Sequence, residues 1–137
     1  MEVLALDIGA VWVGMARANS QARLAEPLQT VKTNEAIAAV QKLVEKQPVE
    51  AIVVGLPRNL SGEDTDQTRW VRDWVAKAKT QINRPFYWQD ESLTSLEAKL
   101  KVQSSKFKDQ GIGEHGLAAA IILQDFLDAP VAKRVVC

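Results

Sequence analysis

Two carboxylic acids stand at the ends of predicted strands, where carboxylates are well placed to hold a metal ion. Asp7 follows the apolar residues 3–6 and precedes a turn at Gly9, and Glu91 lies at the end of the segment 85–92. Two exposed carboxylates in one crevice repel each other unless a cation lies between them, and oxygen ligands suit Mg²⁺ or Mn²⁺. Because such ions activate water and stabilise a leaving oxygen, the pair predicts hydrolysis of phosphodiester bonds.

Each of these residues also has a simpler interpretation. An acid at the end of a strand is commonly a turn residue or a helix cap. His115, the only histidine, stands just before a long apolar segment, where it is as readily a cap or a solvent-facing residue as a ligand. The catalytic interpretation rests on place, because the two acids and His115 are predicted to meet at the edge of one sheet.

Hydrophobic periodicity predicts the elements that position these residues. Strands are expected at residues 3–6, 12–18, 24–31, 51–57 and 85–92. Helices are expected between a cap at Thr33 or Asn34 and Pro48, over 69–82, from a capping box at 94–97, and over 117–127. Trp70 and Trp74 share the apolar stripe of the second helix, which favours a place in the core for both over a base-stacking platform. Residues 131–137 receive no assignment.

The order of these elements predicts a fold of the α/β class. Strands that alternate with helices in the second half favour parallel pairing through right-handed crossovers. We therefore expect one domain over residues 1–137, with a five-stranded mixed sheet and helices on both faces. The first strand is expected at its centre, so that Asp7, the Gly55–Pro57 loop and Glu91 line one crevice at the carboxyl ends of parallel strands.

Composition sets limits on partners and compartment. The 17 basic and 17 acidic side chains cancel, so only a local patch is available to attract nucleic acid. The single cysteine, Cys137, excludes a disulfide framework and a cysteine-based zinc site. Asp7 interrupts the first apolar run, which argues against a signal peptide, and no segment reaches the ~18 apolar residues of a membrane helix. We expect a cytoplasmic protein with no membrane partner.

Four segments in order resemble one known family. They are Asp7-Ile8-Gly9 followed by Gly14, then "IVVGLPRNLSG", "DESLTSLEA" and "LAAAIILQDFLD". Together they resemble the YqgF family, also called RuvX-like, from Val3 to about Asp128. The family's members have an RNase H-like fold and are described as Holliday junction resolvases and as pre-16S rRNA nucleases. The resemblance implies a metal-dependent hydrolase of structured nucleic acid, with Asp7 and Glu91 as catalytic residues and ligands of Mg²⁺ or Mn²⁺.

The chain departs from the family's pattern at three places. Residues 10–12 read Ala-Val-Trp where the family usually has a lysine or arginine, and Ser92 replaces an arginine. His115 stands where the family has its third catalytic acid. His115 is then a ligand or proton carrier, a bystander beside a compensating Glu114, or the sign of a weakened site. Three losses of charge around one crevice favour the weakened site.

The expected partner is nucleic acid, either pre-rRNA during processing of the 5′ end of 16S rRNA in ribosome biogenesis, or branched DNA. Arg58, Asn59, Arg69 and Arg72 lie in or just after the loop that follows the fourth strand, and they are predicted to contact phosphates. The alternatives are a Holliday junction resolvase, which needs a symmetric dimer to match its substrate, and a nucleic-acid-binding module that has lost catalysis. The sequence is compatible with a monomer or a homodimer.

Overall fold

The computed structural model describes residues 1–59, 61–92, 96, 99–100 and 113–137. Its strands are β1 (Glu2–Ile8), β2 (Trp12–Asn19), β3 (Glu26–Lys32), β4 (Val49–Arg58), β5 (Phe86–Ser92) and β6 (Val135–Val136). In the described part of the chain the helices are α1 (Ala36–Lys46), α2 (Asp66–Lys79) and α4 (Glu114–Asp128), with single turns η1 (Thr33–Glu35) and η3 (Val131–Lys133). The capping box expected at 94–97 and most of the loop expected before α4 lie outside the described residues.

The strands form one mixed sheet in the order β3-β2-β1-β4-β5-β6. β1 pairs with β2 antiparallel and with β4 parallel, and β4 pairs with β5 parallel. The α/β class and the central position of β1 are therefore confirmed. The sheet has six strands, not five, because Val135 and Val136 pair with Trp88 and Tyr87 at the edge. A strand of two residues carries no periodicity by which the sequence would reveal it.

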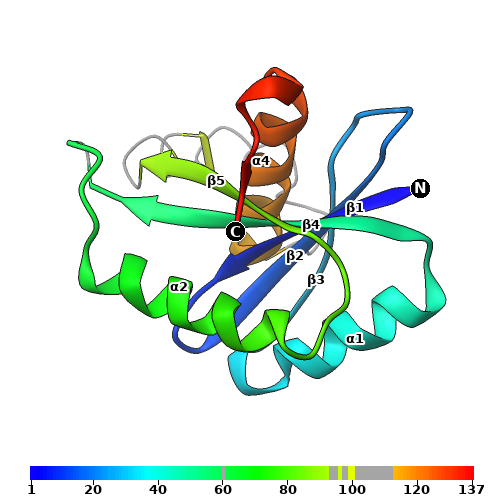
Figure 1. Ribbon diagram of the computed structural model, residues 1–137, viewed down its shortest axis with the longest axis horizontal. Coiled ribbons are helices and arrows are strands. Elements are labelled where there is room, and N and C mark those ends of the chain that lie inside the picture. The colour runs from blue at the N-terminus through cyan, green and yellow to red at the C-terminus, as the bar shows by residue number, and fades with distance from the viewer. Residues whose placement is uncertain (60, 93–95, 97–98, 101–112) are drawn as a thin grey trace.

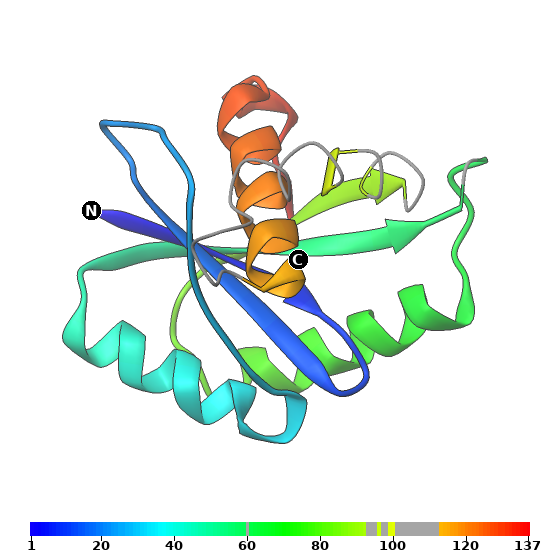
Figure 2. The same cartoon turned by 180° about the vertical axis from the view of Figure 1, so that it is seen from behind.

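Helices cover both faces of this sheet, as predicted. Figures 1 and 2 show α1 and α2 on one face and α4 on the other. β4 is buried on both faces: Ile52 and Val54 pack in the cluster beneath α1 and α2, while Ala51 and Val53 pack in the cluster beneath α4. This two-sided burial explains why β4 reads as a continuous apolar run and pairs in parallel with both neighbours.

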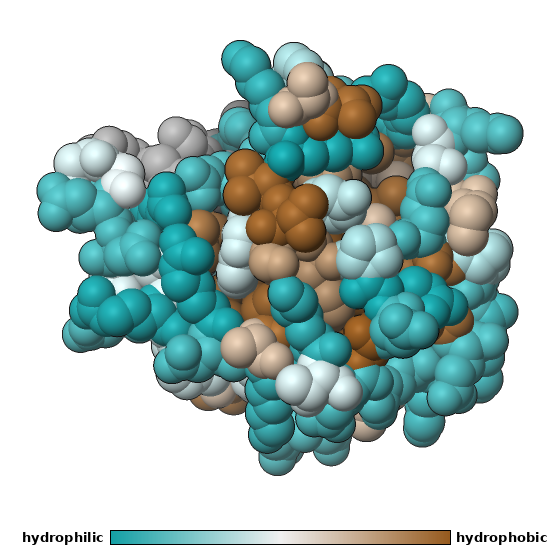
Figure 3. Space-filling view, in the orientation of Figure 1, coloured by the Kyte–Doolittle hydropathy of each residue, from teal (hydrophilic) through white to brown (hydrophobic). Residues whose placement is uncertain are grey.

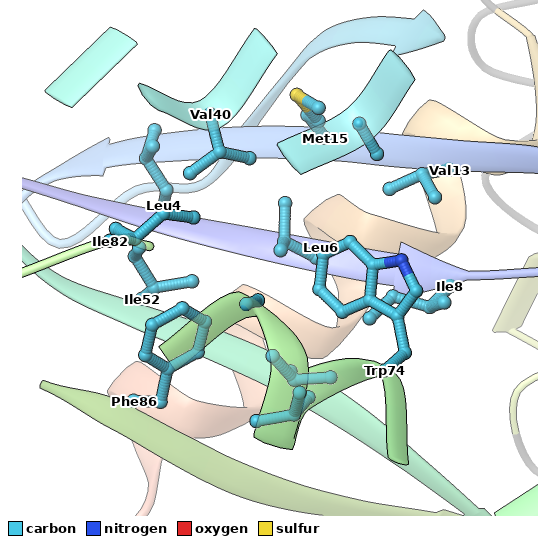
Figure 4. Packing of buried hydrophobic residues seen from close by; sticks show 14 of the residues in the cluster. Leu4, Leu6, Ile8, Val13, Met15, Val40, Ile52, Trp74, Ile82 and Phe86 are labelled. Carbon is cyan, nitrogen blue, oxygen red and sulfur yellow. The ribbon is translucent and has the colours of Figure 1, made fainter. Parts of the chain in front are cut away.

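The larger core lies between the sheet and the pair α1 and α2. Figure 4 shows aliphatic side chains of β1 and β2, such as Leu6 and Met15, packing near Val40 of α1 and Trp74 of α2. Trp74 is a core residue as predicted, but Trp70 is 40% exposed. The prediction for Trp70 was wrong because Val71, Trp74, Val75 and Ala78 already fill the buried stripe, which leaves Trp70 at its rim.

Two predicted helix starts also shift. α1 is preceded by η1, and neither Thr33 nor Asn34 caps it; its N-cap is Glu35, without a side-chain bond. The Thr33 hydroxyl instead donates to the Gly9 carbonyl at 2.7 Å, which ties the β1–β2 turn to the end of β3. α2 begins after Thr65, whose side chain and that of Thr68 form a reciprocal cap.

The face seen in Figure 1 carries apolar side chains in its middle, ringed by hydrophilic ones (Figure 3). Val131, Val135 and Val136, near the C-terminal end of the chain, are among the exposed apolar residues. None of the helices in the described part of the chain has the length and apolar character needed to cross a membrane.

Candidate active site

Asp7 lies near the carboxyl end of the central strand, on the face of the sheet that α4 covers. Leu6 and Ile8 point into the core beneath α1 and α2, so the alternation of a strand turns Asp7 to the opposite face. Its side chain is 28% exposed. Among the described residues, none donates a hydrogen bond to its carboxylate. Asp7 is therefore a largely desolvated acid without hydrogen-bond compensation from the described part of the protein.

Gly14 brings α4 against this acid. Gly14 pairs with Asp7 across β1 and β2, and a Cβ on Gly14 would lie 2.0 Å from the His115 carbonyl oxygen. Only glycine allows the first turn of α4 to lie so close to the sheet. The result is that His115 Nδ1 is 3.9 Å from Asp7 Oδ2, with the His115 side chain 44% exposed. The structure thus places Asp7 and His115 side by side, while their catalytic roles stay a prediction.

The charge state of Asp7 follows from this setting. Burial raises its pKa from 3.8 to about 6, His115 acts in the opposite direction, and Glu114 adds a smaller increase. Burial dominates because the charged form loses hydration without gaining hydrogen bonds. Both members of the first turn of α4 thus act on Asp7, although only His115 is in close contact. A cation beside Asp7 would favour its ionised form and relieve this cost.

A small cavity of about 40 Å³ opens beside Asp7, between the ends of β1 and β4. Because a water needs at least ~10–15 Å³, the space is enough for an ion or a water. It is lined by Asp7, Ile8, Gly55, Pro57, Gln67, Leu96 and Ile122. Gly55 is required here, since a Cβ would lie 2.5 Å from Ile122 Cδ1. Sequence reasoning missed Gln67, whose place in the first turn of α2, after the Gly55–Pro57 loop, was the available signal.

For Glu91 the structure describes the backbone but not the side chain. β5 pairs with β4 so that Glu91 lies opposite Pro57, at the same edge of the sheet as Asp7. Two strand spacings and about two residues along the strand separate the backbones of Asp7 and Glu91, roughly 12 Å. The side chains of Glu91 and Ser92 lie outside what the structure describes, so the predicted approach of the two carboxylates stays a prediction.

The predicted phosphate-binding arginines do not lie with Asp7. Arg58 pairs with Asp64 at 3.2 Å and with Asp90 at 3.1 Å, and Arg72 pairs with Asp64 at 3.3 Å. Arg58 follows Leu56 and Val54 on the face covered by α2, and Arg72 lies 5.5 Å from the Trp88 ring centre. These side chains thus gather on the face opposite to Asp7.

The two remaining predicted contacts are engaged close to their own loop. Arg69 pairs with Asp66 on the first turn of α2. The Asn59 side-chain oxygen accepts from Ser61 Oγ at 2.8 Å and from the Glu63 backbone N–H at 2.9 Å. Their predicted role in binding nucleic acid stays a prediction.

Metal-binding side chains come together only as a pair in the described part of the chain. Asp7 and His115 are close, and no group of three histidine, cysteine, aspartate or glutamate side chains is found among the described residues. A carboxylate oxygen and an imidazole nitrogen suit Mn²⁺, while Mg²⁺ prefers oxygen alone. Glu91 is the predicted further ligand.

Comparisons with known proteins show the family to which the chain belongs. The family model RuvX, described as Holliday junction resolvase, matches residues 1–129. A relative from Chloroflexus aggregans (strain MD-66 / DSM 9485) is 38% identical over 135 residues, with 93% of each chain covered. One from Rickettsia rickettsii (strain Sheila Smith) is 34% identical over 132 residues, with 93% of this chain and 86% of the relative covered. Both are named "Putative pre-16S rRNA nuclease".

Solved structures share the fold. Thermus thermophilus RuvC superposes with a TM-score of 0.60 at 16% identity, covering 100% of both chains. The fowlpox virus Holliday junction resolvase gives a TM-score of 0.57 at 11% identity, over 93% of this chain and 99% of that one. At such identities the likeness concerns the fold alone, and that fold is the RNase H-like fold predicted from the sequence.

Proposed function

The chain belongs to the RuvX family, and from this premise we propose that it is a metal-dependent nuclease that hydrolyses phosphodiester bonds of structured RNA in processing the 5′ end of pre-16S rRNA. One observation carries the proposal: the desolvated Asp7 carboxylate, without a described hydrogen-bond donor, lies at the carboxyl end of the central strand beside His115. The names of the relatives support RNA as the substrate.

The residues present fit a divalent ion. Asp7 supplies a carboxylate that a cation would stabilise in its charged form, because burial holds its pKa at about 6. His115 Nδ1 is a second donor close by, and Glu91 is the third candidate at the same sheet edge. When bound, a divalent ion polarises the phosphodiester and lowers the pKa of a water nucleophile.

The chain's own residues have distinct parts in this reaction. Asp7 supplies the negative charge that would bind the cation, and so would keep the reacting phosphate at this edge of the sheet. His115 is half exposed beside Asp7, so its imidazole is within reach of a bound substrate and is suited to carry a proton to or from the reacting oxygens. Gln67 and Pro57 border the cavity beside Asp7 and limit the space for an ion or a water there.

His115 also affects how tightly the site binds a metal ion. A neutral ligand in place of an acid lowers the affinity for Mg²⁺, which prefers charged oxygen. This supports a weakened site that works better with Mn²⁺ than with Mg²⁺. Glu114, exposed in the same turn of α4, acts on Asp7 only through space, so it supports the compensating role less well.

A second candidate is cleavage of Holliday junctions. The description of the family model and the RuvC-like fold favour it. Both activities break the same kind of bond, but a junction resolvase acts as a symmetric dimer. The mass of the protein in solution therefore separates the two candidates.

A cleavage assay tests the proposal. The protein is incubated with a pre-16S leader RNA and with a four-way DNA junction, each with Mg²⁺, with Mn²⁺ and with a chelator. We expect metal-dependent cleavage of the RNA that Asp7→Asn abolishes. Asp73→Asn, the same chemical change on the exposed side of α2, serves as the matched control. Equal cleavage by the parent and Asp7→Asn would refute the proposed site.

A further inference from the structure

Trp12 and Lys32 form a pair of exposed side chains beside the candidate active site that the proposed reaction does not use. Trp12 is the first residue of β2 and is 41% exposed. Lys32 is the last residue of β3, also exposed, and lies directly opposite Trp12 in the strand register. Residues directly opposite in an antiparallel pair lie on the same face of the sheet, so the two side chains start from neighbouring positions on one face.

The strand pattern assigns this pair to the face that carries Asp7. Val13 and Met15 of β2 point into the core beneath α1 and α2. Gly14 and Ala16 point toward α4, and Trp12 therefore does the same. The alternation of β3 agrees, because a Cβ on Gly116 of α4 would lie 3.8 Å from Thr30 Oγ1, and Lys32 is two residues beyond Thr30.

The same register brings Trp12 close to Asp7. Asp7 lies opposite Gly14 in the β1–β2 register, and Trp12 is two residues from Gly14. Trp12 is therefore the diagonal neighbour of Asp7, with about 7–8 Å between the two Cα positions. The backbone around Trp12 is fixed: Gly9 donates to the Trp12 carbonyl at 2.9 Å, and Thr33 donates to the Val11 carbonyl at 2.9 Å. The backbone that carries the exposed ring is thus held in a defined place next to the acid.

We propose that Trp12 stacks on an unpaired base next to the phosphodiester held at Asp7, while Lys32 contacts a phosphate of the same strand. The inference rests on the proposed function and narrows its substrate to one with a single-stranded segment at the cleavage site. Bases stack on aromatic rings whatever their sequence, and a lysine beside the ring attracts the backbone.

A protein partner is less well supported as the occupant. The exposed apolar surface here comes from Val11 and Trp12, which is small for a protein interface. The adjacent lysine matches the phosphates of a nucleic-acid strand with a base beside it, not an apolar protein surface.

Binding measurements test the pair. The anisotropy of a labelled single-stranded RNA and of its blunt duplex is followed with a chelator present, so that no metal-dependent cleavage occurs. We expect Trp12→Ala to weaken single-strand binding about 5- to 150-fold, the range produced by the loss of one base–aromatic stack. Trp12→Phe should keep most of the affinity, and duplex binding should not change. Lys32→Gln should lower the slope of log K against log salt by about 0.7.

Trp70 offers a matched control, since it has nearly the same exposure, 40%, and lies on α2, which covers the opposite face. Trp70→Ala should bind single-stranded RNA as the parent does. Unchanged binding by Trp12→Ala, equal losses from Trp12→Ala and Trp70→Ala, or equal losses on single strand and duplex would overturn the inference. A melting curve for each variant identifies any loss that comes from unfolding.

The two proposals fail separately. A parent that binds single-stranded RNA through Trp12 but cleaves no substrate with either metal would refute the nuclease and leave the stacking site. A parent that cleaves, with Trp12→Ala binding unchanged, would refute the stacking site and leave the nuclease.

Discussion

Replacing Asp7 by Asn should stabilise the metal-free protein at neutral pH, although it removes the central acid of the site. Burial raises the pKa of Asp7 from 3.8 to about 6, so the folded state holds the charged form less readily than the unfolded chain. At about 1.4 kcal/mol for each pKa unit, this corresponds to about 3 kcal/mol of lost stability when Asp7 is ionised. Asparagine has nearly the same volume and no charge, and it escapes that cost.

The sign of the pH dependence follows from linkage. The cost of the charge is present in full above pH 6, shrinks as the pH falls through the folded pKa, and vanishes below about pH 3.8. The advantage of Asp7→Asn should therefore be largest near pH 8 and disappear near pH 3.5. For a chain of this size, about 3 kcal/mol is a rise in melting temperature of roughly 10 °C.

The assay is urea or thermal unfolding of the parent, Asp7→Asn and Asp73→Asn at pH 8 and near pH 3.5, with a chelator present. Asp73→Asn should stay within about 0.5 kcal/mol of the parent at both pH values, as exposed substitutions usually do. Added Mn²⁺ should stabilise the parent by about 2.7 kcal/mol at one hundred times its Kd, and Asp7→Asn much less. If Asp7→Asn is no more stable than the parent at pH 8, the carboxylate is not the desolvated group described above.

Three further outcomes are expected. His115→Asp should raise cleavage with Mg²⁺ above the parent, because it restores a charged oxygen ligand; a parent already as fast as this variant would contradict the weakened site. Gly14→Ala should destabilise the protein by about 3 kcal/mol or more and separate α4 from Asp7, since its Cβ would meet backbone at 2.0 Å; Gly116→Ala, whose nearest contact would be 3.5 Å, should be neutral or slightly stabilising in the same unfolding experiment. The sequence alone predicts that the triple variant Arg58→Ala, Arg69→Ala, Arg72→Ala lowers the salt slope of nucleic-acid binding by about two to three; because Arg58 and Arg72 pair with Asp64 and Asp90 on the face opposite to Asp7, we expect the slope to stay close to that of the parent, and a fall of two to three would place these arginines on the binding surface.

Most of the fold could be predicted from the sequence because the hydrophobic periodicity of its main helices and strands is unambiguous. β4 is apolar on both faces and stands between two helical patterns, which is sufficient to predict parallel pairing and the central β1. β6 was not predicted because a strand of two residues shows no hydrophobic periodicity. The cap predicted at Thr33 failed for a different reason: its hydroxyl bonds to Gly9, far along the chain, and no local pattern announces a tertiary hydrogen bond.

The site was predictable in part. Asp7 follows from its position at a strand end, and the closeness of His115 follows once α4 packs on β2. The sequence does not predict how closely the two approach, because this depends on the missing Cβ of Gly14. The arginines illustrate the opposite error. Nearness in sequence to the Gly55–Pro57 loop suggested nearness to Asp7, but the alternation of β4 turns Arg58 to the other face of the sheet.

The departures from the family's pattern share one physical explanation, which is how the substrate strand would be held next to Asp7. The stretch from Ala10 to Trp12 lacks a cation, yet it presents an exposed aromatic ring on the face of the acid, with Lys32 opposite. A base stacked on Trp12 would hold the strand without the charge that the family usually supplies there. A strand so held depends less on tight metal binding for its position, because part of the orientation of the reacting phosphate comes from the neighbouring base. His115 is tolerable in such a site. On this reasoning Trp12→Ala and His115→Asp are coupled: restoring the acid should recover more of the cleavage rate in the Trp12→Ala variant than it adds to the parent, and independent effects in this double-mutant cycle would separate the two features.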